Sequence, residues 1–308
     1  MRICVLMLAL GAFLHADELP SEPWLTGPLL APLGSVVPYG HLEIEPYVYS
    51  TTNTGIYNTN WKSVSTSNFF SLNSQILCFF GLTPWMDINI VPQFFYNTTS
   101  NQNSVNFGDL SVVLEFQLLD PAATPYFPGI KLSVKENFPT GPFQNLNPHK
   151  LRTDQTGFGA YATTFNVVLY DVYHLGGSHF LSTTYSAAYT VNPPVHVRGF
   201  NTYGGGHGTN GKVLPGNNFQ ALISFELTLS KNWVFAIDNV YTHTDATSFF
   251  GTSTAHVGVP SSEQISFAPA IEYNFSSHFG IIAGCWFTAW GRNSLIFRSG
   301  VIAFDYTY

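Results

Sequence analysis

The amino-acid sequence predicts an all-β protein, a transmembrane antiparallel β-barrel of about 12 strands with both termini in the periplasm. Composition, connection lengths and the pattern of the last strand predict it. Charged residues make up 9% of the 308-residue chain and aromatic residues 16%, whereas about 25% of residues are charged in typical soluble proteins. After the N-terminus, no apolar run reaches the roughly 18 residues that a transmembrane helix needs. These features favour a chain that crosses a membrane with strands.

The first residues have the features of a secretory signal peptide. Arg2 is the only charge before an apolar run from Ile3 to Phe13, and Leu14-His15-Ala16 offers a cleavage site before Asp17. A short buried helix is the alternative. We expect residues 1–16 to be removed on export, which leaves 18 acidic residues and, without Arg2, one base fewer than the 11 of the full chain. This balance does not resemble a basic nucleic-acid-binding surface.

Residues 17–40 contain five prolines, at positions 20, 23, 28, 32 and 38, and show little periodicity. We expect a periplasmic N-terminal segment that either enters the mouth of the barrel or forms a disordered leader. Residues 41–308 should form the outer-membrane β-barrel itself.

Twelve stretches of residues 41–308 have strand character. They lie at roughly 41–53, 69–82, 86–98, 106–118, 128–138, 156–173, 178–192, 217–230, 232–244, 262–275, 278–290 and 295–308. Their connections tend to alternate between short turns, such as Thr83-Pro84-Trp85 and Ser276-Ser277, and longer loops at 54–68, 139–155, 193–216 and 245–261. Short periplasmic turns and long external loops are typical of outer-membrane barrels. The glycine-rich loop 193–216 is expected to be flexible.

Alternation within the strands separates two faces. In 262–275, for example, Phe267 and Ile271 share one face, and Ser266 and Glu272 share the other. A charge on the lipid face costs about 2–4 kcal/mol near the bilayer midplane, so the polar face should point into the lumen. The charged residues expected to face the lumen are Glu43, Glu45, Asp87, Asp109, Glu115, Lys131, Lys135, Glu226, Asp238, Glu272 and Asp305.

Nine acidic residues against two bases leave two interpretations of the lumen open. The acids could form a wet path that favours cations. Alternatively, they could pair with Lys131, Lys135 and loop arginines and hold a packed barrel together.

The last strand ends on an aromatic face. Phe304, Tyr306 and Tyr308 lie on one face with Ile302, while Thr307 and Asp305 lie on the other. We interpret Phe304, Tyr306 and Tyr308 as a C-terminal signal for the outer-membrane assembly machinery. The expected partners are therefore that machinery, outer-membrane lipids and a small-molecule solute, and not nucleic acid.

Three short motifs resemble a known family. They are Phe107-Gly108-Asp109-Leu110-Ser111, then Lys131-Leu132-Ser133-Val134 leading to Pro139-Thr140-Gly141, and Thr156-Gly157-Phe158-Gly159. They are similar to segments of the outer-membrane barrel family named for the MetA pathway of phenol degradation. The resemblance covers mainly residues 105–190 and implies a transporter of aromatic or hydrophobic solutes. It assigns no binding residue.

No catalytic constellation emerges from the residues. His243 near Asp245 is the nearest fragment of a lipid hydrolase site, without a matching serine, and the histidines lack metal-ligand spacing. We expect no enzyme, metal or cofactor. The favoured function is an outer-membrane channel for passive uptake of small solutes, hydrophobic or aromatic ones among them. The alternative is a surface-exposed structural or adhesive barrel with a plugged lumen, and a lipid hydrolase is less favoured.

Overall fold

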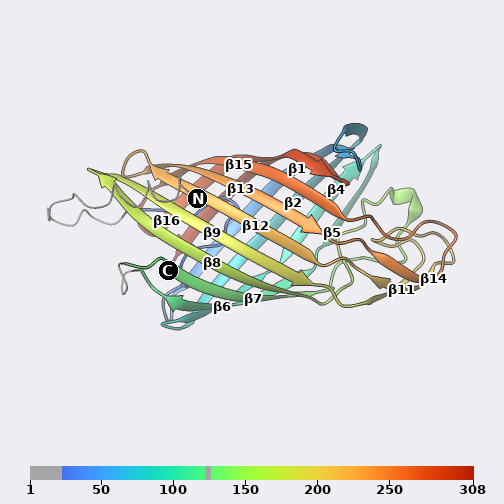
Figure 1. Cartoon of the computed structure of the whole chain (residues 1–308), viewed down its shortest axis with the longest axis horizontal. Coiled ribbons are helices and arrows are strands. Elements are labelled where there is room, and N and C mark those ends of the chain that lie inside the picture. Colours follow the sequence, from blue (N-terminus) through green and yellow to red (C-terminus); the bar gives the residue numbers. More distant parts are fainter. Residues whose placement is uncertain (1–22, 122–125) are drawn as a thin grey trace, which may run out of the picture.

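The computed structural model describes residues 23–121 and 126–308. Its main feature is a closed antiparallel barrel of twelve spanning strands (Figure 1). Ten of these are single strands: β1 (Leu42–Tyr57), β2 (Ser63–Thr83), β7 (Gly129–Phe138), β8 (Ala162–Gly176), β9 (His179–Val191), β12 (Asn218–Thr228), β13 (Trp233–Thr244), β15 (Ser262–Asn274), β16 (Phe279–Arg292) and β17 (Ser294–Thr307). Pairing of β1 with both β2 and β17 closes the barrel.

The other two spanning strands are each interrupted once. β3 (Met86–Val91) and β4 (Gln93–Thr99) lie on either side of Pro92, which has no N–H to donate to the sheet. β5 (Gln102–Phe107) and β6 (Leu110–Leu119) are separated by Gly108 and Asp109. All twelve expected strands are therefore present, and the all-β barrel class predicted from the sequence is confirmed.

The first hairpin is longer than the sequence suggested. The connection expected at 54–68 is reduced to residues 58–62, because β1 and β2 continue to pair beyond a register shift at Asn53–Gly55. The short turns and the C-terminus lie toward the left of Figure 1, where the backbones of Leu42 and Tyr308 pair through hydrogen bonds of 3.1 and 2.7 Å. We call this the turn end, and the opposite end, with the longer connections, the loop end.

The loop end carries a second, three-stranded sheet of β10 (Val195–Arg198), β11 (Asn210–Leu214) and β14 (Ser248–Thr252) (right in Figure 1). A 3₁₀ turn, η1 (Pro148–Lys150), lies in the loop between β7 and β8. The glycine-rich loop 193–216 thus contains two strands, β10 and β11, which the sequence did not indicate. Its Tyr203 is buried and donates a 2.6 Å hydrogen bond from Oη to the carbonyl oxygen of Phe158.

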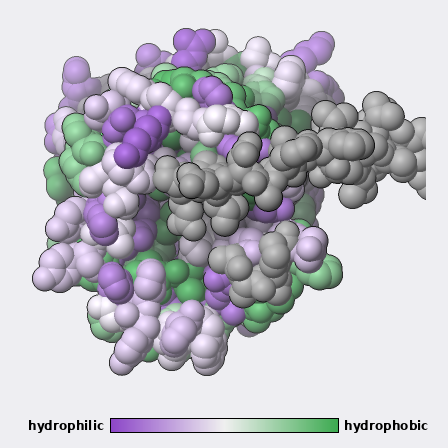
Figure 2. Space-filling view, turned by 90° about the vertical axis from the view of Figure 1, so that its left-hand side faces the viewer, coloured by the Kyte–Doolittle hydropathy of each residue, from purple (hydrophilic) through white to green (hydrophobic). Residues whose placement is uncertain are grey.

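The barrel wall is apolar outside. Large hydrophobic side chains on alternate positions are exposed, among them Leu72, Ile223, Ile271 and Ile302. Figure 2, which faces the turn end, shows mostly hydrophilic and intermediate side chains there, with hydrophobic ones among them. Within the described residues, no helix is long and apolar enough to cross a membrane.

Candidate functional site: the lumen and its N-terminal segment

The described part of the N-terminal segment, residues 23–40, enters the barrel. Leu29 is 1% exposed and packs in one cluster with residues of β1, β13, β15, β16 and β17. Ala31 packs against Leu222 of β12 and Val240 of β13. The sequence left two alternatives open for this segment, entry into the mouth of the barrel or a disordered leader. The described residues enter the barrel. Residues 17–22 and the expected signal peptide lie outside the described part of the chain.

Three of the expected lumen acids hold this segment by its backbone. Glu272 Oε2 accepts hydrogen bonds from Thr26 N–H at 3.2 Å and from Thr26 Oγ1 at 2.9 Å. Asp238 Oδ2 accepts from Leu30 N–H at 2.8 Å, and Asp87 Oδ2 accepts from Val37 N–H at 2.7 Å. An irregular segment cannot satisfy its own amides, so wall carboxylates supply the acceptors that burial requires.

Glycines in the wall leave room for the segment. A Cβ built on Gly280 of β16 would overlap Thr26, and one on Gly81 of β2 would overlap the carbonyl of Pro38. On the segment itself, a Cβ on Gly34 would lie 2.5 Å from the ring of Tyr170. The wall and the segment are therefore complementary in shape as well as in hydrogen bonding.

Ion pairing accounts for few of the remaining charges. Lys131 Nζ lies 2.9 Å from Glu115 Oε2, with both side chains buried, and also donates to the carbonyl of Ser35 at 3.4 Å. Glu226 Oε2 accepts from Ser182 Oγ at 2.8 Å. Among the described residues, the second alternative, in which the lumen acids pair with Lys131, Lys135 and loop arginines, is seen as an ion pair for Lys131 and Glu115.

Asp109 lies at the break between β5 and β6. It accepts hydrogen bonds from the N–H groups of Gly141 at 3.0 Å and Phe158 at 2.8 Å. Gly141 and Phe158 belong to two of the motifs that carry the family resemblance. These motifs thus meet around one carboxylate that ties the β7–β8 loop to the wall.

Between the N-terminal segment and the loop end lies a cavity of about 1140 Å³, which we call the outer cavity. Leu30 contributes from the segment, and Leu151, Arg152 and Phe158 contribute from the β7–β8 loop. Aromatic rings line much of the wall, namely Tyr49, Phe69, Phe95, Trp286 and Phe297. Lys135 and Arg152 are its charged lining residues, and none of the described residues around it is acidic.

Arg152 is positioned by polar contacts. Its Nε donates to Gln155 Oε1 at 3.0 Å and its Nη2 donates to the carbonyl of Thr202 at 2.9 Å. Partial burial lowers the pKa of the Arg152 guanidinium from its usual value, but arginine stays charged at neutral pH. The sequence indicated only that loop arginines could pair with lumen acids. The fold of the β7–β8 loop is what brings Arg152 to the cavity.

A smaller cavity of about 340 Å³, which we call the inner cavity, surrounds residues 28–33 of the segment. It shares Leu30, Tyr49, Gln75, Lys135 and Gln220 with the outer cavity, so the two adjoin past the segment. Glu45 and Glu115 line the inner cavity. The acids expected along a solute path are thus concentrated around the N-terminal segment.

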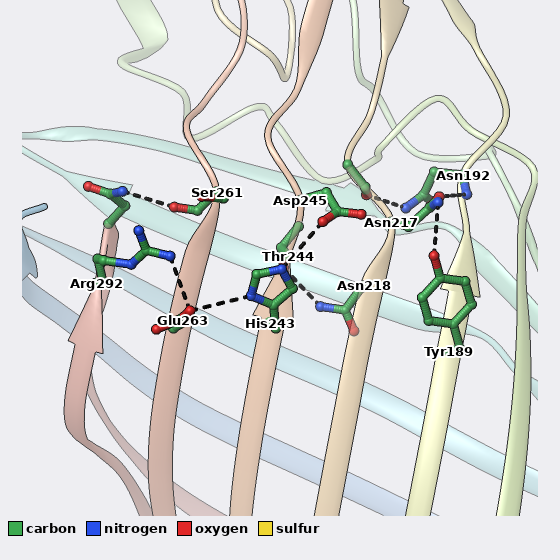
Figure 3. A network of polar contacts seen from close by, with 12 residues as sticks. Tyr189, Asn192, Asn217, Asn218, His243, Thr244, Asp245, Ser261, Glu263 and Arg292 are labelled. Atoms are coloured by element: carbon green, nitrogen blue, oxygen red, sulfur yellow. Dashed lines mark hydrogen bonds and ion pairs between the residues drawn. The ribbon is translucent and has the colours of Figure 1, made fainter.

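A polar network marks the loop-end rim of β13, β15 and β16 (Figure 3). His243 Nε2 lies 3.3 Å from Asp245 Oδ1, and His243 Nδ1 lies 3.7 Å from Glu263 Oε1. Arg292 Nη2 lies 3.1 Å from the same Glu263 oxygen. Both ring nitrogens of His243 thus face carboxylates, and its contacts among the described residues include no serine that a hydrolase would need.

The expected assembly residues lie at the turn end of β17. Tyr306 and Tyr308 are exposed, Phe304 is half-buried, and Ile302 is exposed on the same face. On the opposite face Ala303 and Val301 are buried.

Comparison with solved structures identifies the fold. The crystal structure of the COG4313 outer membrane channel from Pseudomonas putida F1 superposes with a TM-score of 0.66 over 89% of this chain and 97% of that chain, at 14% sequence identity. The beta domain of the Bordetella autotransporter Brka gives a TM-score of 0.49 over 88% of this chain and 100% of that chain, at 8% identity. No protein-family model and no curated protein matches the sequence. The chain has the fold of an outer-membrane β-barrel.

Proposed function

We propose that this protein is a bacterial outer-membrane channel for passive uptake of small solutes, exported by a signal peptide at residues 1–16. The observation that carries the proposal is the outer cavity, which adjoins the inner cavity past the N-terminal segment within a closed barrel. In the proposed orientation, the loop end faces the outside of the cell and the turn end faces the periplasm. Solutes therefore enter between the loops. The apolar outer wall of the barrel supports the proposal that lipid surrounds it.

The lining of the outer cavity supports a solute class. Aromatic rings offer stacking surfaces, polar side chains such as Asn73 and Gln75 offer hydrogen bonds, and Lys135 and Arg152 attract negative charge. We therefore propose small aromatic solutes that carry a carboxylate. This proposal departs from the interpretation in which the lumen acids form a path that favours cations, because three of the acids accept hydrogen bonds from the N-terminal segment and Glu115 pairs with Lys131.

A second candidate is a surface or structural barrel with a plugged lumen. The buried N-terminal segment and the ordered loop-end sheet favour it. In that case the cavities would not connect the two sides of the membrane. We propose no enzymatic activity, and the contacts of His243 support this choice.

The test is solute flux into proteoliposomes that contain the purified barrel. Benzoate should enter faster than benzylammonium, which has a similar ring and the opposite charge. Replacing both Lys135 and Arg152 with glutamine should reduce that preference. Glu263→Gln on the outer rim serves as the control and should leave it unchanged. Liposomes that admit neither solute would support the plugged alternative, and faster entry of benzylammonium would contradict the proposed role of the two bases.

A further inference from the structure

Three carboxylates meet at the seam where the first and last strands close the barrel. Glu43 and Glu45 share one face of β1 because side chains two residues apart in a strand point the same way. The register that pairs Ile44 with Tyr306 and Tyr47 with Ala303 sets Glu45 opposite Asp305 of β17. One carboxylate oxygen from each of Glu43, Glu45 and Asp305 lies within 4.8 Å of the other two.

The buried member of this group has an unsatisfied oxygen. Glu45 is 3% exposed, and its Oε1 accepts no hydrogen bond from any described residue. Oδ1 of Asp305 is likewise buried without a partner among these residues. The lysine and arginine ion pairs in the described chain join Lys131 to Glu115 and Arg292 to Glu263, so none neutralises this group. Buried anionic oxygens normally have a hydrogen-bond donor or a cation beside them.

The backbone pairing of the seam is weakest beside the same carboxylates. The β1–β17 ladder includes Ile44 and resumes at Tyr47, without a pair at Glu45 or Pro46. Pro46 has no N–H to donate. Mutual repulsion of the three carboxylates would push the two strands apart at this point.

We propose that Glu43, Glu45 and Asp305 bind one Ca²⁺ ion, which fastens β1 to β17 at the turn end of the barrel. Calcium takes six to eight oxygen ligands in flexible geometry, and carboxylates are its preferred protein ligands. Glu43 and Asp305 are only partly buried, so water can complete the coordination. The histidine spacing that argued against metal binding does not bear on this site, because its ligands come from strands at opposite ends of the barrel sequence.

The test uses the full-length barrel, refolded in detergent without lipopolysaccharide and freed of metal with EDTA. Calorimetric titration should show one Ca²⁺ bound per barrel. Tyr47, two residues from Glu45 on the same face of β1, should sensitise luminescence of bound Tb³⁺. Glu45→Gln and Asp305→Asn should each weaken Ca²⁺ binding about tenfold or more. Glu226→Gln, a buried carboxylate outside the group, is the matched control and should bind as the wild type does.

A second measurement tests whether Ca²⁺ stabilises the seam between β1 and β17. Ca²⁺ should raise the temperature at which the wild-type barrel loses its folded mobility in electrophoresis, and Glu45→Gln should abolish that rise. A wild-type barrel without saturable Ca²⁺ binding at millimolar concentration overturns the proposal, whatever the variants do, and indicates that protons neutralise the group. Equal loss of binding in Glu226→Gln also overturns it. Transport is not measured, so a failure here leaves the proposed channel function to its own test.

Discussion

The backbone N–H of Leu30 donates a 2.8 Å hydrogen bond to Asp238, a residue 208 positions later in the chain. Asp238 is fully buried, and Leu30 lines both cavities. One carboxylate of the wall thus holds the part of the N-terminal segment that separates the two cavities. Stability of the segment and permeability of the lumen should therefore change together.

Asp238→Ala should loosen the segment and raise single-channel conductance. The substitution leaves the partly buried Leu30 N–H without its acceptor, at a cost of about 1–3 kcal/mol. The measurement is conductance in planar bilayers together with a thermal unfolding curve. Asp245→Ala, an acid on the outer rim, is the control. Unchanged conductance in a correctly folded Asp238→Ala barrel would show that the segment does not restrict the path.

Gly280→Ala should disturb the segment from the opposite wall. Its new Cβ would overlap Thr26, whereas a Cβ on Gly300 has no atom within 4 Å. Overpacking of this kind costs about 1–3 kcal/mol. Thermal unfolding of the two variants measures the difference. The close fit of segment and wall would be contradicted by equal melting temperatures for Gly280→Ala and Gly300→Ala.

Two neighbouring residues on β2 should differ in how much an introduced charge destabilises the barrel. Leu72 is exposed on the outer wall, and Asn73 lines the outer cavity. Leu72→Arg should cost about 2–4 kcal/mol if it lies near the bilayer midplane, while Asn73→Arg should be tolerated. Urea titration in lipid vesicles gives the two free energies of unfolding. Greater damage from Asn73→Arg would reverse the assignment of the faces.

The double variant Phe304→Ser and Tyr308→Ser should lower the amount of folded barrel in the outer membrane, because it removes aromatic side chains from the last strand. The yield is measured as heat-modifiable protein in isolated outer membranes. Phe250→Ser, an exposed aromatic residue of the loop-end sheet, should have no such effect. A normal yield of the double variant would refute the interpretation of this strand as an assembly signal.

Local sequence patterns were sufficient to predict the strands of the barrel. Alternation has a period of two residues and is visible in any one strand, as in β15, where Ala268 and Glu272 are buried and Ile271 is exposed. The interruption at Pro92 and the long first hairpin were not predicted. The hairpin depends on how far β1 and β2 pair, which polar sequences such as residues 58–68 do not reveal.

The sequence by itself determined the barrel class and the strand number, because each follows from composition or from neighbours along the chain, and it predicted acids on the polar faces of the strands. Tertiary structure decided what those acids contact. Glu272, Asp238 and Asp87 accept hydrogen bonds from backbone amides of residues 26–37, and Lys135 and Arg152 both line a cavity whose described lining residues include no acid. These contacts join residues far apart in sequence, and a carboxylate on a strand has the same local pattern whether its partner is a solute, a cation or another segment of its own chain.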